Sequence, residues 1–187
     1  MEDNSSYWLA LTRIEGLGTR TAHKLAERFG SARDVYRASL NQLEGCGLPA
    51  HVAQAIFAQA GLKEAEAAKE AAVKGQYRIL TCGDEDYPPL LAHIADPPLV
   101  LYALGDVKVL SELAVAMVGT RRPTAYGSAV ATRLARELAE RRLVIVSGLA
   151  RGIDSASHRG ALEAKGKTVA VLGSGLDVIY PRENKRL

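Results

Sequence analysis

Three short apolar runs each lead into a loop that contains glycine together with arginine or serine. The runs are 114–119, 143–148 and 168–173, and the loops that follow begin Thr120-Arg121-Arg122, Leu149-Ala150-Arg151 and Ser174-Gly175. Ligands of open parallel sheets bind beyond the carboxyl ends of the strands, where glycine exposes backbone amides and arginine supplies fixed positive charge. We therefore predict a phosphate-type anion site at these three strand ends.

The side chains of these loops have distinct expected roles. Arg121 and Arg122 follow a buried strand and precede a helix, whose positive N-terminal end also favours an anion. Ser147 can donate a hydroxyl, Gly148 can expose an amide, and Arg151 can reach a phosphate. The alternative for the first two is that one arginine pairs with a carboxylate and the other is solvated.

Two polar residues open the helix that follows the second loop. Asp154 is interpreted as a helix N-cap rather than an acid catalyst. His158 is interpreted as a structural histidine. The alternative is a catalytic pair, in which His158, four residues after Asp154, is the base and the Asp154 carboxylate orients it.

Two segments resemble nucleotide-binding motifs but do not match them. The segment 160–168 imitates a P-loop, but it has one residue too many between its glycines and precedes a strand. The segment 173–178 begins like a dinucleotide fingerprint, but Val178 stands where the third glycine belongs. Cys46 and Cys82 lie far apart, without the spacing of metal ligands. We expect no cofactor, no metal and no disulfide framework.

The hydrophobic pattern changes near residue 75. A chain of 187 residues that is 48% hydrophobic can build a core in one or two compact units. Residues 1–75 show only helical patterns and close with an Ala-, Glu- and Lys-rich segment before Gly75. From there, strands at 77–80 and 99–102 precede an alternation of strands and helices that predicts right-handed βαβ units. We predict a helical domain over 1–75 and an α/β domain over 76–187.

The helix expected at 124–142 should cover the sheet with one apolar stripe. Val130, Leu134 and Leu138 recur every four residues and form this expected stripe, with Ala131 and Ala135 beside them. The expected outer face consists of Arg133, Arg136, Glu137 and Glu140.

A turn in the helical part contains Gly16 and Gly18 and leads into a helix at Thr19. Its pattern is that of helix-hairpin-helix modules, and residues 43–49 look like a degraded second copy. Glycines at such a turn let backbone amides face a DNA phosphate. We expect Gly16, Gly18 and Thr19 to form a secondary DNA contact, the alternative being a plain turn between helices.

Charge and targeting patterns give weaker information. The formal net charge of +3 is too small to indicate a polyanionic partner by itself. The start of the chain lacks an export pattern, and no stretch of about 18 apolar residues occurs. We expect a cytoplasmic protein with no membrane partner.

Four motifs together resemble the DNA-processing protein A (DprA/Smf) family. They are 117–123, 147–154 with His158, 166–168, and 173–184 with its Tyr-Pro-Arg-Glu-Asn ending. The resemblance covers most of 76–187, and the preceding part is similar to that family's N-terminal domain. It implies α/β architecture: a small helical domain, SAM-like with a helix-hairpin-helix, followed by an incomplete Rossmann-like parallel-sheet domain.

The resemblance also implies a function. It indicates a non-enzymatic mediator that binds and protects single-stranded DNA during natural transformation and loads the RecA recombinase. Single-stranded-DNA-binding protein is a further implied partner, and the full-length protein is implied to be a homodimer. The implied pocket consists of Arg121, Arg122, Ser147, Gly148, Arg151, Lys167 and Asn184. Family members continue beyond this last segment, so we expect the sheet to have an unpaired edge or to be completed by further chain.

Two other functions remain as alternatives. One is a nucleotide hydrolase similar to phosphoribohydrolases, but the Pro-Gly-Gly-x-Gly-Thr-x-x-Glu segment of those enzymes does not occur here. The other is an interaction module, which predicts weak and salt-insensitive association with DNA.

Overall fold

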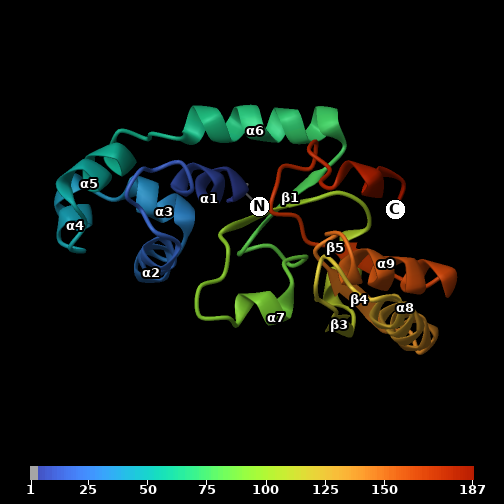
Figure 1. Cartoon of the computed structure of the whole chain (residues 1–187). Helices are drawn as coiled ribbons and strands as arrows, with labels where there is room; N and C mark the ends of the chain where they lie inside the picture. The colour runs from blue at the N-terminus through green and yellow to red at the C-terminus, as the bar shows by residue number, and fades with distance from the viewer. Residues whose placement is uncertain (1–3) are drawn as a thin grey trace. The chain divides into compact units, whose positions relative to one another are not determined.

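The computed structural model describes residues 4–187 and divides into two compact units (Figure 1). Unit 1 is Met1–Gly105 and unit 2 is Asp106–Leu187. Among the described residues, no helix is both long and apolar enough to cross a membrane. Unit 1 has the helices α1 Ser5–Leu11, α2 Thr19–Phe29, α3 Ala32–Arg37, α4 Leu40–Glu44, α5 Ala50–Phe57, α6 Leu62–Gly75 and α7 Pro89–Ala92.

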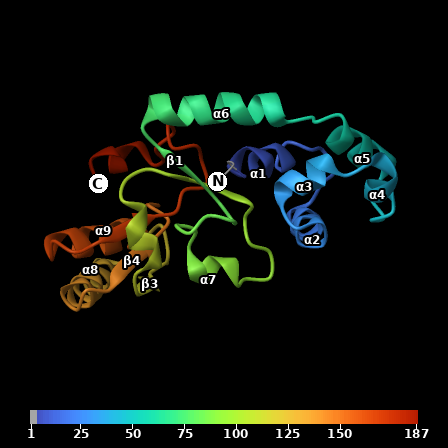
Figure 2. The ribbon, with the colours of Figure 1, turned by 180° about the vertical axis from the view of Figure 1, so that it is seen from behind.

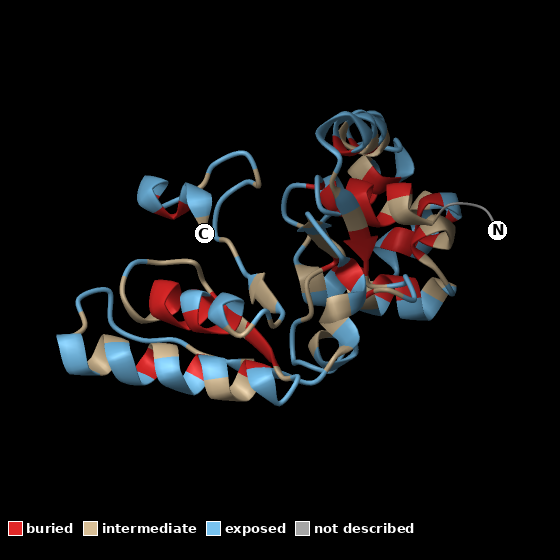
Figure 3. Cartoon of the chain, turned by 90° about the vertical axis from the view of Figure 1, so that its right-hand side faces the viewer, coloured by how far each residue is buried: buried red, intermediate tan, exposed pale blue. Residues whose placement is uncertain are grey.

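The helices of unit 1 enclose an apolar core (Figure 3). Serine side chains fix where two of them begin, since Ser31 accepts a hydrogen bond from the Asp34 amide and Ser39 forms a capping box with Gln42. The fully buried core residues include Leu9, Leu11, Val35, Leu43, Val52 and Ile56. Both cysteines of the chain lie in this unit and are free thiols.

An antiparallel hairpin joins this helical core. Its strands are β1, Arg78–Thr81, and β2, Val100–Ala103, with Ile79 opposite Tyr102. Ile79 and Val100 pack against the helical core, so the hairpin belongs to unit 1 by its contacts. The predicted domain limits, 1–75 and 76–187, stay a prediction, because compactness alone does not show which segments fold independently.

Unit 2 is a parallel sheet with helical crossovers, as the sequence predicts. The strands β3 Ala114–Ala116, β4 Val144–Ser147 and β5 Thr168–Ala170 lie in the order β3-β4-β5, and both pairings are parallel. The helices α8, Ala125–Glu140, and α9, Ile153–Glu163, connect them and pack side by side (Figures 1 and 2). Two 3-10 helices complete the unit, η1 at Val107–Ser111 and η2 at Arg182–Arg186.

The expected packing stripe of α8 holds in part. Ala131 and Ala135 are buried, as Ala139 is, and Leu138 packs against the core, but Val130 and Leu134 remain 44% and 46% exposed. The reason is a close approach of α9, because a Cβ at Gly160 would collide with the Thr132 carbonyl oxygen and lie 3.0 Å from the Ala135 Cβ. At that helix separation only small side chains fit, and the larger ones turn outward.

Candidate functional site

The parallel sheet of unit 2 brings the three predicted loops to one edge. Parallel strands end on the same side, so residues 117–124, 148–152 and 171–180 all leave the carboxyl edge of β3-β4-β5. Backbone pairing continues slightly beyond the strands, since the Met117 amide donates to the Val146 carbonyl at 2.9 Å and the Val171 amide to the Ser147 carbonyl at 2.9 Å.

The first two loops touch each other at glycines. A Cβ at Gly119 would lie 2.7 Å from the Ile153 side chain, and one at Gly152 would lie 2.8 Å from the Arg121 carbonyl carbon. Gly152 also has φ of +79°, a conformation that side chains rarely adopt. The Ile153 amide donates to the Thr120 carbonyl at 3.2 Å. The backbone of Arg121 is therefore held beside Arg151 and the start of α9.

Arg121 and Arg122 are exposed at this junction. Within residues 4–187, neither guanidinium has an ion pair or a hydrogen-bond acceptor. The loop itself is ordered, because the Arg122 amide donates to the Thr120 hydroxyl at 3.2 Å and Thr124 caps α8. Two fixed positive charges on an ordered loop, without a counter-ion from the described chain, suit an anionic ligand.

Ser147 and Gly148 serve the loop internally. The Ser147 hydroxyl is 3% exposed and donates to the Met117 carbonyl at 2.6 Å. The Gly148 and Ala150 amides both donate to one oxygen of Asp154, at 3.1 and 3.4 Å. The buried Asp154 carboxylate thus occupies the amides that a phosphate would need. Asp154 is also not the N-cap of α9, a position that Gly152 takes.

Arg151 is paired with an acid from the C-terminal segment. Its guanidinium donates two hydrogen bonds to Glu183, Nε to Oε1 at 2.6 Å and Nη2 to Oε2 at 3.2 Å. This pair raises the pKa of Arg151 and lowers the pKa of Glu183, in both cases chiefly through the side-chain hydrogen bond. Both side chains are 56% exposed, so an approaching anion can compete with Glu183 for Arg151.

Asn184 anchors this C-terminal segment from within. Its side chain is 7% exposed, and its amide nitrogen donates to the Leu149 carbonyl at 2.8 Å and the Ser155 hydroxyl at 2.7 Å. The anchor holds η2 against the second loop. The pattern of strands and loops does not point to three further cations, which lie in η2: Arg182, Lys185 and Arg186. Their sequence signal is the cluster of basic residues in and after the Tyr-Pro-Arg-Glu-Asn motif.

Lys167 is not brought to this edge. It directly precedes β5, at the amino edge of the sheet, and its ammonium forms an ion pair with Glu112. A cavity of about 410 Å³ lies at that edge, between the C-terminal ends of α8 and α9, and Lys167 lines it together with Glu112 and Arg142.

His158 lies inside unit 2 and has no catalytic partner. Its Nδ1 is 2.6 Å from the Thr168 hydroxyl, and its buried Nε2 has no hydrogen-bond partner in the described chain. Burial lowers the pKa of His158, and the charge of Asp154 opposes this shift. The structure therefore supports a neutral structural histidine. No group of three His, Cys, Asp or Glu side chains that could hold a metal occurs in residues 4–187.

The turn of unit 1 that contains Gly16 and Gly18 is exposed. Gly16 has φ of +82°, and the imidazole of His51, from the first turn of α5, lies over it. Gly18 is the N-cap of α2, and a Cβ there would meet no atom within 4 Å. Thr19 begins α2 and is half-buried. The turn thus leaves room for a ligand at Gly18 but not at Gly16.

Charge is divided unevenly between the units. Residues 106–187 contain 14 lysines and arginines against 8 aspartates and glutamates, a formal charge of +6. Residues 1–105 contain 10 against 13, a formal charge of −3. The modest net charge of the chain therefore conceals a strongly basic unit 2, whose loops carry the unpaired arginines.

A basic, parallel α/β unit with helical crossovers and arginine-bearing loops at its carboxyl edge defines a protein of the Rossmann-like class. The family model described as DNA recombination-mediator protein A matches residues 78–187, and the chain belongs to this family. It is 36% identical to Protein Smf of Synechocystis sp., over 97% of this chain and 47% of the relative. It is 38% identical to the DNA processing protein DprA of Streptococcus pneumoniae, over 98% of this chain and 63% of the relative.

Solved structures of the family are similar as well. The crystal structure of DNA processing protein A from Streptococcus pneumoniae has a TM-score of 0.77 and 32% identity, covering 97% of this chain and 62% of that one. The protein from Helicobacter pylori, described for its single-stranded DNA binding mode, has a TM-score of 0.52 and 44% identity over 58% of this chain. The chain thus spans about half to two thirds of the length of these proteins.

Proposed function

We propose that this chain binds single-stranded DNA at the carboxyl edge of unit 2, as a mediator of recombination rather than as an enzyme. The observation that carries the proposal is the pair Arg121 and Arg122, exposed and without acidic partners in the described chain, on a loop fixed against Gly152. Family membership and the charge of +6 on unit 2 support it.

The strand's phosphates would cross from the first loop to η2. Arg121 and Arg122 bind at one end, Arg151 exchanges Glu183 for a phosphate in the middle, and the cations of η2 extend the track. Asn184, Ser147 and Gly148 contribute by holding the loops, since their polar groups are engaged internally. Lys167 is left out of the track, because it lies at the opposite edge of the sheet.

Two of the three carboxylates beside these loops are engaged, which favours binding over hydrolysis. A hydrolase needs a carboxylate that is free to activate water. Asp154, in the first turn of α9, is 7% exposed and holds two amides, and Glu183 of η2 is paired with Arg151. Asp177 of the third loop is exposed and forms no ion pair within residues 4–187. Tyr126 and Tyr180, 80% and 58% exposed, are the aromatic side chains on which bases could stack, so electrostatics should dominate the affinity.

Titration of fluorescent oligothymidine at several salt concentrations tests the proposal. The double variant Arg121→Gln/Arg122→Gln should lower the slope of log affinity against log salt by about 1.4, or about 0.7 for each lost phosphate contact. Arg159→Gln/Lys165→Gln, which removes the same charge from exposed positions within and just after α9, is the matched control. Unchanged single-strand affinity of the double variant would refute the site, and preferential binding of a mononucleotide would favour the hydrolase.

We further propose, from family membership, that the protein protects the strand in the cytoplasm and passes it to RecA. In this proposal, single-stranded-DNA-binding protein is displaced from the strand, and the active form is a homodimer of the full-length protein. RecA filament assembly on a strand coated with that protein is the assay. If this chain binds DNA yet fails to promote assembly, the loading role belongs to the rest of the longer relatives.

A further inference from the structure

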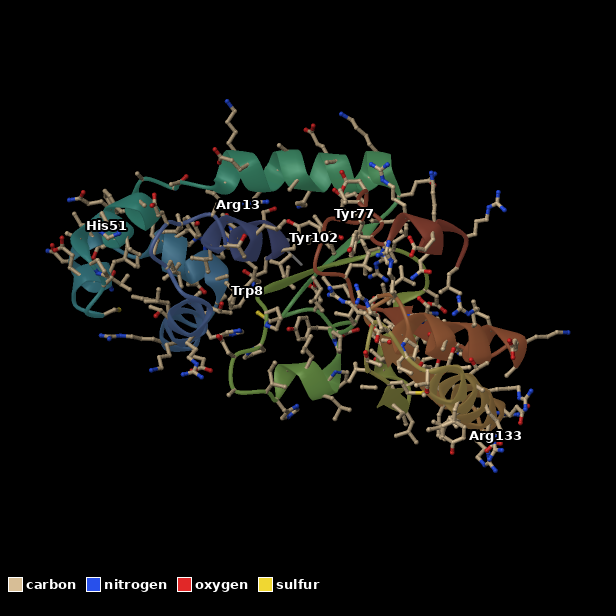
Figure 4. All side chains as sticks on the ribbon, in the orientation of Figure 1. Trp8, Arg13, His51, Tyr77, Tyr102 and Arg133 are labelled. Carbon is tan, nitrogen blue, oxygen red and sulfur yellow. The ribbon has the colours of Figure 1, made fainter. Side chains whose placement is uncertain are left out.

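The outer face of α2 carries a row of positive charge. Arg20, Lys24 and Arg28 are exposed and follow one another at intervals of four residues. Such spacing places them on one face of the helix, about 6 Å apart along its axis. Figure 4 shows nitrogen-tipped side chains that project outward around α2. The row forms a straight cationic edge about 12 Å long.

This row lacks acidic partners although unit 1 is acidic. Some other cations of the unit lie beside acids, as Arg37 does with Asp34 and Arg78 with Asp86. In the described chain, Lys63 and Lys74 of α6 form no such pair. Across residues 4–187, none of the three side chains of the row forms an ion pair. Glu27 is the one acid within α2. The row therefore keeps its charge available for an external anion.

The two aromatic rings within α2, His23 and Phe29, are half-buried and engaged inside unit 1. The ring of His23 packs 5.6 Å from that of Trp8, and its Nε2 lies 3.0 Å from the Pro97 carbonyl oxygen. Phe29 packs against the core of unit 1. Binders of single strands combine cations with aromatic side chains, whereas a duplex keeps its bases inside and presents a regular row of phosphates. The chemistry of α2 therefore matches a duplex backbone.

We propose that the row Arg20, Lys24 and Arg28 binds the phosphate backbone of double-stranded DNA without regard to sequence. This surface is separate from the single-strand track of unit 2 and uses other residues. The exposed turn at Gly18, where α2 begins, adds unsubstituted backbone at the end of the row. A protein with both surfaces engages a single strand and a duplex by different units.

The test uses the full chain and a fluorescent 20-base-pair duplex at several salt concentrations. Arg20→Gln/Lys24→Gln should weaken binding about tenfold or more and lower the salt slope by about 1.8, or about 0.9 per lost contact. Lys63→Gln/Lys74→Gln removes the same charge from exposed positions of α6 and should change neither quantity comparably. Glu27→Gln should tighten duplex binding, a gain that misfolding cannot produce.

Oligothymidine binding is measured in parallel and should be unaffected by the α2 variants. Equal losses from the α2 and α6 variants would overturn the proposal, because net charge alone would then explain binding. Loss of single-strand binding only, or no loss at all, would overturn it as well. Failure of Arg121→Gln/Arg122→Gln to weaken single-strand binding would count against the unit 2 site and leave this surface standing.

Discussion

Replacing Gly160 by alanine should destabilise unit 2, although alanine favours helices. Gly160 lies in α9 where that helix meets α8, and the added methyl group would collide with the Thr132 carbonyl oxygen and lie 3.0 Å from the Ala135 Cβ. Neither atom is at the end of a flexible side chain. The two helices would therefore have to separate by about 1 Å, in a core that is otherwise close-packed.

Two opposing terms decide the magnitude. Overpacking of this kind costs about 3 kcal/mol at the upper end of its usual range. Exchange of glycine for alanine within a helix returns about 1 kcal/mol. The net loss should be about 2 kcal/mol. Gly127→Ala, in the first turn of α8, is the matched control, because its Cβ would make only ordinary contacts, with the Thr124 hydroxyl at 3.4 Å and the Pro123 Cβ at 3.8 Å. This variant should stabilise unit 2 by up to about 1 kcal/mol.

Urea unfolding followed by far-ultraviolet circular dichroism measures the effect. The single tryptophan, Trp8, lies in unit 1, so its fluorescence reports separately on the unit that should not respond. With a slope near 1 kcal/mol per molar urea, the unit 2 midpoint should fall by about 2 M. A Gly160→Ala protein as stable as the parent, or more stable, would show that the close approach of α8 and α9 is not a constraint.

Three further predictions concern the loops of unit 2. Glu183→Gln should release Arg151 and tighten oligothymidine binding severalfold at low salt. Glu163→Gln, at the C-terminal end of α9 and away from Arg151, should not tighten binding. Equal effects of the two variants would assign the gain to net charge. Asn184→Ala removes one buried and one partly buried hydrogen bond, worth about 2 kcal/mol together, and should speed hydrogen exchange in 182–187 and 149–155 without lowering the Trp8 transition. Unchanged exchange would contradict the role of Asn184 as an anchor. Because burial holds the pKa of His158 below 6.5, the unfolded chain binds its proton more readily, so unit 2 should lose stability as pH falls below about 6.5. In urea unfolding, the stability of His158→Asn should depend less steeply on pH than that of the parent. An equally steep dependence would assign the effect to other titratable groups.

The sequence predicted unit 2 well because its strands are apolar runs with glycine-rich ends. Strand order and crossover handedness follow from alternation with helices, so the position of Arg121 and Arg151 at one edge was predictable. The packing face of α8 is predictable only in part, because periodicity indicates the side of Ala131 and Ala135 but not how closely a neighbouring helix approaches, and that approach turns Val130 and Leu134 outward. Lys167 illustrates a second limit. A motif match placed it in the pocket, but a residue just before a strand lies at the amino edge of the sheet.

Engaged polar groups were also beyond prediction. Serine and glycine at a strand end are equally suited to a ligand and to internal hydrogen bonds. The carbonyl of Met117, 30 residues before Ser147, and the buried carboxylate of Asp154, six residues after Gly148, decide the role of these two residues. Nothing local to Ser147 or Gly148 shows that their partners lie within the fold.

The contact between Gly152 and the first loop couples two segments that are 31 to 32 residues apart in the chain. A residue larger than glycine at 152 requires the backbone at Thr120 and Arg121 to move, and a longer first loop would displace the start of α9. Variation in either loop therefore has to be matched in the other. In variant libraries that randomise one loop alone, most substitutions will disrupt the contact between the two loops. Changes in ligand preference that keep this contact will be found among paired substitutions in both loops.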